Sequence, residues 1–226
     1  MWVKAELNFA SFFSYRIPGT SPSYTPASPV PSPVALRLAL VDAAIQKSGS
    51  VDYGRDIFNL IQRAPMEVIP PQEVCLIRVF LKRLKPGKKG GLLESTGVRE
   101  YCHFPGPLTV YLKVDSREPE IVKLWQWMRR LGTTDSLLTA TAWIIDEKPP
   151  KNLCWQELSS LPLAKRNFQH RFVTTLIDLG GSSFDQVNPY VAGTPKYKLK
   201  TYVLPLVLAE RGENWRRYCR EPFELP

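Results

Sequence analysis

The sequence is poor in the residues that most often carry out chemistry. It holds two histidines, His103 and His170, among 226 residues, and its four cysteines form neither a CxxC pair nor a cysteine–histidine spacing typical of zinc sites. A Walker-type loop, a paired acidic metal motif and a GxSxG sequence are also missing. We therefore predict no metal site, no cofactor and no catalytic residue.

Long apolar runs are missing as well. No uninterrupted stretch approaches the roughly 20 residues that span a bilayer, and the first residues lack the basic and apolar regions of a secretory signal. We expect a cytoplasmic protein with reduced thiols. Basic charge is in excess, since 30 lysines and arginines against 21 aspartates and glutamates give a net charge of +9. That excess favours a polyanionic partner, either nucleic acid or an acidic membrane surface. The alternative is charge that only aids solubility.

The apolar pattern defines the first two elements. Residues from Val3 to Phe9 alternate between apolar and polar, which is typical of a strand with one buried face. A helix over residues 34–45 is apolar on nearly every side, and Ser32 as N-cap and Gly49 past the end mark its limits. Such a helix is expected to be buried between a sheet and another layer. Residues 52–71 suggest only a short helical piece.

Four further elements complete the pattern. They are a strand over Val74–Leu81, a strand over Leu108–Val114, a helix from a cap at Asp115 or Ser116 to Leu131, and a strand over Leu137–Ile145. The resulting order, β-α-β-β-α-β, is the ferredoxin-like arrangement of many RNA-binding domains. We predict an α+β fold in which the two middle strands are the central pair of one antiparallel sheet.

The chain is expected to divide into two parts. Residues 1–146 form the ferredoxin-like domain, and residues 147–226 form a C-terminal extension that contains β-strands and packs on the sheet. Within a strand over residues 198–208, Pro205 allows only an edge position or a bulge, because proline cannot donate a ladder hydrogen bond. From Glu210 onward, alternating charged and aromatic residues are expected to lie loosely at the surface.

The densest basic charge falls between the two middle strands, in a run from Lys82 to Gly91. No packed core could hold so many cations together, so we predict a basic thumb hairpin inserted at about residues 82–107. Its glycines would let the backbone follow an irregular nucleic-acid strand. The alternative is a solvated hairpin tip whose lysines prevent edge pairing. The cations expected to contact phosphates are Lys82, Arg83, Lys85, Lys88, Lys89 and Arg99.

A mixed surface of rings and cations is expected beside this hairpin. If the two middle strands pair, one sheet face presents aromatic rings that stack bases and cations that track phosphates. The alternative is that the C-terminal extension covers the two rings, Phe80 and Tyr111. The residues expected on that face are Arg78, Phe80, Lys82, Thr109, Tyr111 and Lys113.

His103 leaves one catalytic alternative open. With Tyr101 or Lys85, it could act as a general base in metal-independent RNA cleavage. A lone histidine near a basic loop is more often a donor to phosphate or backbone, and no carboxylate or cysteine stands at motif spacing from it. We therefore favour a binding role.

Several segments together are similar to one known family. The first strand runs into Ser11-Phe12-Phe13-Ser14-Tyr15-Arg16, and Ser23-Tyr24-Thr25-Pro26 with Pro29–Pro33 leads into the buried helix. Thr96-Gly97-Val98-Arg99-Glu100-Tyr101 matches a threonine-x-x-arginine-glutamate segment, and Thr201–Leu206 fits a late strand. These segments resemble the CRISPR-associated RAMP superfamily, and within it the Cas-five subunit of type I Cascade-like effector complexes.

The resemblance implies a non-catalytic subunit that binds the 5′ handle of a crRNA, with no membrane partner. It also implies contacts with the backbone-forming subunit, the large subunit that reads the protospacer-adjacent motif, and target DNA near that motif. One branch of the family cleaves pre-crRNA, so a metal-independent endoribonuclease is the alternative. The CRISPR subtype stays open, because the buried helix begins without the family's usual glycine. Besides the six cations of the hairpin, the residues then expected at the RNA are Ser14, Tyr15, Arg16, Tyr24, Arg37, Tyr101 and His103.

Overall fold

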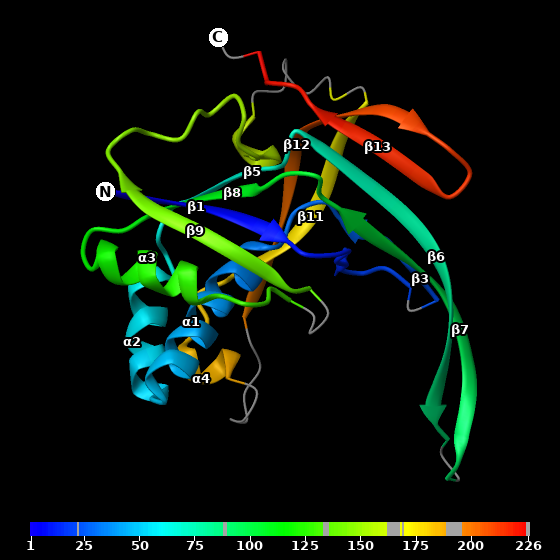
Figure 1. Ribbon diagram of the computed structural model, residues 1–226, viewed down its shortest axis with the longest axis horizontal. Helices are drawn as coiled ribbons and strands as arrows, with labels where there is room; N and C mark the ends of the chain where they lie inside the picture. Colours follow the sequence, from blue (N-terminus) through cyan, green and yellow to red (C-terminus); the bar gives the residue numbers. More distant parts are fainter. Residues whose placement is uncertain are drawn as a thin grey trace.

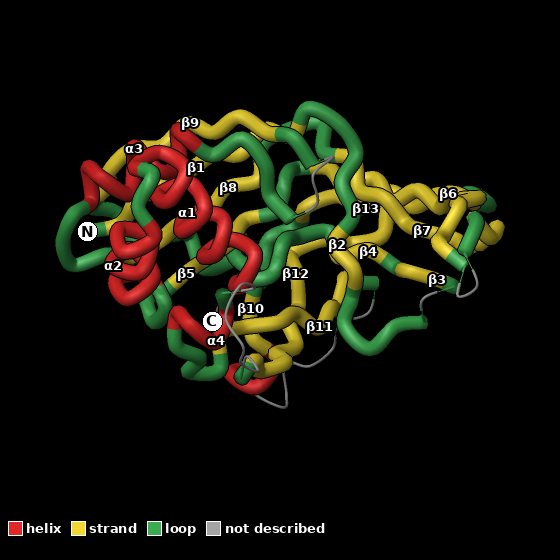
Figure 2. The backbone as a smooth tube through the Cα atoms, turned by 90° about the horizontal axis from the view of Figure 1, so that it is seen from below, coloured by secondary structure: helices red, strands yellow, loops and turns green. Residues whose placement is uncertain are grey.

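The structure, a computed structural model, describes residues 1–21, 23–87, 90–132, 136–161, 168, 170–188 and 196–224. It is a strand-rich mixture of helices and strands. A four-stranded sheet carries the helices on one face, and a larger sheet carries a long hairpin that leaves the body of the molecule (Figure 1). A view turned by 90° shows the same hairpin reaching away from the helices (Figure 2).

The four-stranded sheet has the strand order β5-β8-β1-β9, and each neighbouring pair is antiparallel. The alternation at the start of the chain is confirmed as a strand, because Val3, Ala5 and Leu7 all point into the core with no exposed surface. The bounds are β1 (Trp2–Phe9), β5 (Met66–Ile69), β8 (Leu108–Lys113) and β9 (Leu138–Ile145).

The helices begin and end at residues with identifiable capping chemistry. The Ser32 hydroxyl accepts the Ala35 N–H at 3.2 Å, as predicted for the first helix. Gly49, at φ 69°, donates its N–H to the Ile45 carbonyl at 2.7 Å and ends that helix, also as predicted. The bounds are α1 (Pro33–Ser48), α2 (Val51–Ile61), α3 (Glu118–Trp127) and α4 (Phe184–Val187). Nothing among the described helices is long and apolar enough to cross a membrane.

Helix α3 differs from the prediction at both ends. Its cap is Arg117, at φ 64°, rather than Asp115 or Ser116. The helix ends at Trp127 instead of Leu131, because the backbone beyond it pairs with the start of β9: the Leu138 N–H donates to the Arg129 carbonyl at 2.9 Å. The expected apolar stripe is nevertheless buried, with Ile121, Leu124, Met128 and Leu131 at most 2% exposed.

The second sheet joins the middle of the chain to its C-terminal part. Its order is β10-β12-β13-β6-β7-β3, with β11 paired to β12 as well. The β3–β7 pair is parallel and the others are antiparallel. The bounds are β3 (Tyr24–Thr25), β6 (Glu73–Pro86), β7 (Leu92–His103), β10 (Gln156–Glu157), β11 (Arg171–Leu179), β12 (Tyr197–Arg211) and β13 (Trp215–Arg220). A small two-stranded sheet pairs β2 (Tyr15–Arg16) with β4 (Ala27–Ser28), and a 3-10 turn covers Leu158–Ser160.

Two predictions about strand placement are wrong. Strands β6 and β8 do not pair with each other, because the short strand β5 takes the place beside β8 and the chain changes sheets at Pro70-Pro71. The residues after Glu210 do not lie loosely at the surface, since β13 is an internal strand between β12 and β6. Tyr218 of β13 is only 6% exposed and belongs to the main core.

Phe80 and Tyr111 consequently lie in different sheets and differ in exposure. Tyr111, in the four-stranded sheet, is 7% exposed and lies in an apolar cluster with Cys154 and Leu153, so the C-terminal extension does cover it. Phe80, on the hairpin, is 67% exposed. The single face of rings and cations expected from pairing of the two middle strands therefore does not exist, and the hairpin alone carries the exposed part of that pattern.

Pro205 lies at an irregular point of the second sheet, as predicted. The register of β11 against β12 shifts between the pairs Arg171–Val207 and Val173–Val203, on either side of this proline. One apolar cluster runs through both sheets and includes Leu204 and Leu206 of β12. The division of the chain near residue 146 stays a prediction.

Candidate nucleic-acid interface

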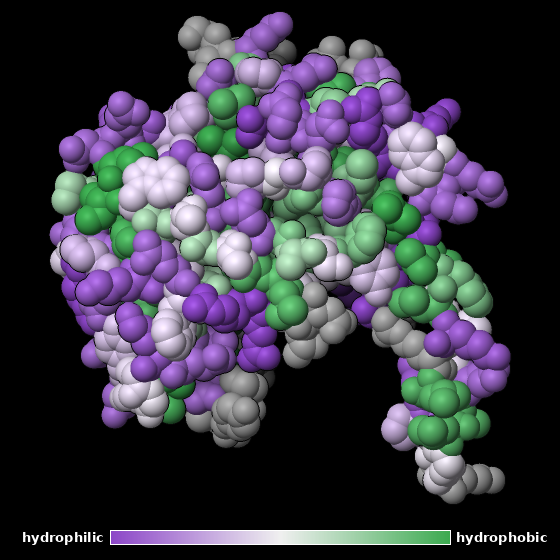
Figure 3. Space-filling model, viewed as in Figure 1, coloured by the Kyte–Doolittle hydropathy of each residue, from purple (hydrophilic) through white to green (hydrophobic). Residues whose placement is uncertain are grey.

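The hairpin is formed by β6 and β7, whose register runs without interruption from Cys75 opposite His103 to Pro86 opposite Leu92. At a rise of about 3.3 Å per residue, β6 is roughly 45 Å long. Its distal half stands apart from the body, and the space-filling view shows open space between the two (Figure 3). The predicted basic hairpin is therefore present, although its strands begin well inside the sheet. Lys88 and Lys89, also expected to contact phosphates, lie outside the described residues.

Directly opposite residues in an antiparallel pair share one face, so the hairpin has two defined surfaces. We call one the Glu100 face; near the body it is buried at Leu76 and Cys102, and it becomes exposed further out. The other is the Tyr101 face. The outward part of the Glu100 face consists of Arg78, Phe80, Lys82, Leu84, Glu94, Thr96 and Val98, and the Tyr101 face includes Val79, Leu81, Lys85, Arg99, Tyr101 and His103.

A buried carboxylate organises the base of the Glu100 face. Glu100 is 1% exposed and accepts the Ala27 N–H at 3.1 Å. Arg216 of β13 donates to its other oxygen, and the Arg78 Nε lies 3.6 Å from that same oxygen. Burial works against the charge on Arg216, but the charge of Glu100 and the hydrogen bond to it raise the pKa of this arginine overall. Glu100 thereby holds both arginines in place.

The two arginines keep part of their surface free, since the side chain of Arg78 is 40% exposed and that of Arg216 is 30% exposed. They line a hollow of about 390 Å³ at the junction of the hairpin with the β12–β13 turn. Guanidinium groups positioned in this way suit phosphate oxygens. The other lining residues are Leu76, Glu100, Arg211, Gly212, Glu213, Asn214 and Trp215.

Exposed rings surround these arginines. The Arg78 guanidinium lies 5.7 Å from the centre of the Tyr24 ring, which is 40% exposed on strand β3. Phe80 follows Arg78 outward on the same face. Trp215 is 41% exposed and also lines the hollow, but it pairs with Ile77 and so belongs to the Tyr101 face. Rings beside cations form the kind of surface on which single-stranded bases stack while phosphates are neutralised.

The predicted cations of the hairpin are distributed over both faces. Lys82 pairs with Glu94 at 2.8 Å on the Glu100 face, and both side chains are more than half exposed. Lys85 and Arg99, on the Tyr101 face, line a smaller hollow of about 100 Å³ with Ser23 and other residues. Arg83 pairs with Ser95 through its backbone, and its side chain lies outside the described part.

The segment Ser14–Arg16 lies against the base of the hairpin, where it has a mainly structural role. The Ser14 hydroxyl donates to the Glu100 carbonyl at 2.8 Å. Tyr15 is turned inward, and burial raises the pKa of its phenol well above the usual range. Arg16 remains exposed, and it donates to the hydroxyl of Thr20 at 3.3 Å and to the Thr20 carbonyl.

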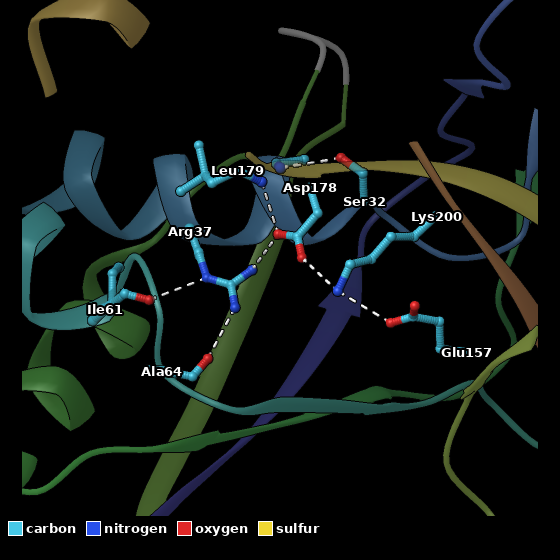
Figure 4. Close-up of polar contacts among 9 residues, drawn as sticks. Ser32, Arg37, Ile61, Ala64, Glu157, Asp178, Leu179 and Lys200 are labelled. Carbon is cyan, nitrogen blue, oxygen red and sulfur yellow. Dashed lines mark hydrogen bonds and ion pairs between the residues drawn. The ribbon is translucent and has the colours of Figure 1, made fainter. Parts of the chain in front are cut away.

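Arg37 does not belong to this surface. Its Nε donates to the Ile61 carbonyl at 3.1 Å, and its other two nitrogens bond the Ala64 carbonyl at 2.9 Å and Asp178 at 3.0 Å (Figure 4). Burial lowers the pKa of Arg37, although Asp178 opposes that shift. Lys200 bonds Asp178 in turn, so the network ties α1 to the C-terminal strands. The expectation that Arg37 contacts RNA is therefore corrected: this arginine holds the body together.

The three residues considered for RNA cleavage are not brought together. Tyr101 and His103 share one face of β7, and the exposed His103 ring lies 5.5 Å from the Phe12 ring. Lys85 pairs with Leu93, ten residues before His103 on β7, which corresponds to roughly 33 Å along the strand. Lys85 therefore cannot assist His103. Over the described ranges, there is no group of three or more histidine, cysteine, aspartate or glutamate side chains that could hold a metal ion.

Sequence reasoning missed four residues of the interface. Glu100 was part of a recognised segment but had no assigned role, and Arg211, Trp215 and Arg216 fell in a part expected to pack loosely. Residues 215–220, Trp-Arg-Arg-Tyr-Cys-Arg, do not alternate strictly between apolar and polar, so periodicity alone does not indicate a strand there. Only the pairing of β13 with β6 shows that these side chains meet the hairpin.

Comparison with known proteins shows that the chain is similar in sequence to a CRISPR-associated protein. The CRISPR-associated protein Cas5 of Archaeoglobus fulgidus is 32% identical over 223 residues, which cover 95% of this chain and 96% of that protein. No protein-family model matches the chain. The crystal structure of a CRISPR protein from Archaeoglobus fulgidus aligns with 97% of this chain and 92% of that one, at 12% identity and a TM-score of 0.44. A chain of a CRISPR RNA-guided surveillance complex aligns with 98% and 91%, at 12% identity and a TM-score of 0.41.

Proposed function

Because the chain belongs to the Cas5 family of CRISPR-associated proteins, we propose that it is a non-catalytic RNA-binding subunit of a Cascade-type effector. Its ligand is the 5′ handle of a crRNA, held at the base of the hairpin. The observation that carries this proposal is the group of exposed rings and half-exposed arginines around Glu100. Together these groups offer both stacking surface and phosphate contacts within one short stretch of surface.

In this proposal the RNA runs from the hollow at Arg78 and Arg216 outward along the Glu100 face. Phe80 and Tyr24 stack bases, while Lys82 and the cations of the tip neutralise phosphates. The chain itself is ferredoxin-like over residues 1–146, with β5 as the second strand and the β6–β7 hairpin inserted between it and β8. Strand order β5-β8-β1-β9 with antiparallel neighbours supports that assignment.

The partners follow from the same family role. We propose that the backbone-forming subunit and the large subunit lie beside the bound handle, and that target DNA near the protospacer-adjacent motif comes close to this end of the complex. The apolar residues of the hairpin's outer part, including Leu84 at 62% and Leu92 at 64% exposed, support a protein contact there.

The test is the salt dependence of RNA binding. Binding of a repeat RNA to the wild-type chain and to a double variant on the Glu100 face, Arg78→Gln with Lys82→Gln, would be measured by fluorescence anisotropy from 50 to 300 mM KCl. Each lost phosphate contact reduces the slope of log K against log salt by about 0.7 for single-stranded RNA, so the double variant should lose about 1.4. Lys47→Gln is the control. It removes one positive charge from the exposed last turn of α1, which is the same change of charge as at each of the two tested sites. An unchanged slope in the double variant would exclude this surface.

The endoribonuclease alternative has one structural support, the placement of Tyr101 and His103 on the same face of β7. It predicts that the purified protein cleaves repeat RNA in EDTA and that His103→Ala abolishes cleavage. The binding role predicts intact RNA with both proteins. Cleavage that depends on His103 would replace the proposed function with that of a processing enzyme.

A further inference from the structure

Strand β9 forms one edge of the four-stranded sheet, and among the described residues β1 is its only strand partner. It spans eight residues, Leu138–Ile145, without a charge or a proline. Its register with β1 continues through all eight positions without a bulge. Proteins usually protect such edges with lysine, proline, bulges or a covering segment, because unpaired backbone groups attract another strand.

The register shows which backbone groups of β9 are free. The Ala10 N–H donates to the Leu137 carbonyl at 2.9 Å, so hydrogen-bonded pairs with β1 recur at Thr139, Thr141 and Trp143. Alternate residues point their N–H and carbonyl groups away from β1. At Leu138, that N–H donates to Arg129, and at Ala142, the carbonyl accepts the Gln126 side chain at 3.3 Å. Both backbone groups of Ala140 and Ile144 face the open edge.

Helix α3 makes one side of this edge basic. Gln126 meets Ala142, and Arg129 meets the start of β9, so α3 runs along the strand in the opposite direction. Lys123, one turn before Gln126, then lies toward Ile144. Lys123 and Arg129 are exposed, whereas the acidic residues of α3 lie in its first turn. On the other face of the sheet, the edge presents Trp143 at 38% exposed.

We propose that the edge of β9 receives an extended acidic segment of a partner protein by strand addition. The free N–H and carbonyl groups of Ala140 and Ile144 bond the added backbone. Side chains of the added strand alternate, with acids toward Lys123 and Arg129 and apolar groups toward Trp143. A second copy of the chain is disfavoured, because a two-fold axis at this edge would bring the basic side of α3 beside its own copy. This inference does not depend on RNA binding.

A capped ten-residue peptide of alternating glutamate and valine tests the proposal, with the lysine–valine peptide as the charge-reversed control. Hydrogen exchange by NMR follows the backbone amides of the full chain. The expected result is at least tenfold slower exchange at Ala140 and Ile144 with the acidic peptide. The amides of Thr139 and Thr141 already bond β1 and should change little. Equal protection by the lysine peptide, or no protection by either, would overturn the proposal.

Two variants make the test specific. Ala140→Pro removes an N–H that points away from β1, so the sheet is retained and peptide affinity falls at least tenfold. Ile144→Glu adds an acid to the same edge and should also lower peptide affinity at least tenfold. It replaces Ala140→Pro as the test if the proline variant does not fold. Val173→Glu, at 43% exposed on β11, is the control of equal charge and should bind normally. Dimerisation of the wild-type chain that Ala140→Pro abolishes would assign the edge to a second copy and refute the acidic partner.

Discussion

A substitution at Glu100 should affect protein stability and RNA affinity in opposite directions. The carboxylate of Glu100 is almost fully buried and accepts the Ala27 N–H while facing Arg78 and Arg216. Glu100→Gln keeps the shape of the side chain and an oxygen for the Ala27 N–H, but it removes the negative charge between two arginines. We expect the variant to be less stable and to bind RNA more tightly.

The loss of stability can be bounded from exposure. Removing one partner of a fully buried ion pair costs about 3–5 kcal/mol. Here the arginine side chains are 40% and 30% exposed, so water replaces part of the lost interaction. The free energy of unfolding should therefore fall by about 1–2 kcal/mol. For a chain of this size, that corresponds to a Tm lower by roughly 2–8 °C.

The effect on RNA has the opposite sign. Without Glu100, both guanidinium groups are free to pair with phosphate, and one more cation contributes to binding. The salt slope of RNA binding should become steeper by up to about 0.7, and affinity at low salt should rise. Urea unfolding and anisotropy titrations on the same preparations measure the two effects.

The matched control is Glu94→Gln on the same face, where the Lys82–Glu94 pair has side chains 60% and 64% exposed. Its loss should change stability by only a few tenths of a kcal/mol. If Glu100→Gln folds normally and binds RNA more weakly than wild type, then positioning of Arg78 and Arg216 by Glu100 matters more than the neutralisation of their charge, and the expectation of tighter binding is wrong.

Two further predictions concern the body of the protein. Gly49→Ala should lower the free energy of unfolding by about 1–2 kcal/mol, because Gly49 has φ 69°. Gly106→Ala is the control and should cost much less, since Gly106 has open space and no positive φ. Urea unfolding measures both, and equal losses would contradict this reasoning. Burial raises the pKa of the Cys154 thiol from 9.0 to about 12, so the unfolded chain loses this proton at lower pH than the folded chain. The free energy of unfolding should therefore fall as pH rises from 9 to 12, by up to about 1.4 kcal/mol per pH unit. Cys154→Ala should flatten the urea midpoint's decline over the same interval, and an unchanged decline would show that the thiol is not protected.

The local elements were predictable because their signals are local. Ser32 and Gly49 define α1 through contacts within four residues, and the alternation of Val3 to Phe9 needs only one buried face. The basic hairpin was predictable for a related reason, since charge of that density cannot be buried.

The order of the strands could not be predicted as well from the sequence, because it depends on pairing between distant segments. Met66–Ile69 is too short for periodicity to distinguish it from a helix end, yet it decides which strand lies beside β8. The interface shows the same limit. Arg216 meets Glu100 across 116 positions of sequence, and no spacing motif connects two residues that far apart. For Arg37 the prediction of RNA contact was wrong for a similar reason. Its three acceptors, the carbonyls of Ile61 and Ala64 and the carboxylate of Asp178, are not indicated by its position in the sequence.

The internal position of β13 has a consequence for how the protein is made. Because β13 lies between β12 and β6, the sheet that supports the hairpin can close only after Trp215–Arg220 have been synthesised. A nascent chain that still lacks β13 also lacks Arg216 and the rim of the hollow. Pairings over such long separations form late in folding. The strands of the hairpin are therefore synthesised before the hollow at their base can form, and that hollow is completed only when β13 pairs with β6.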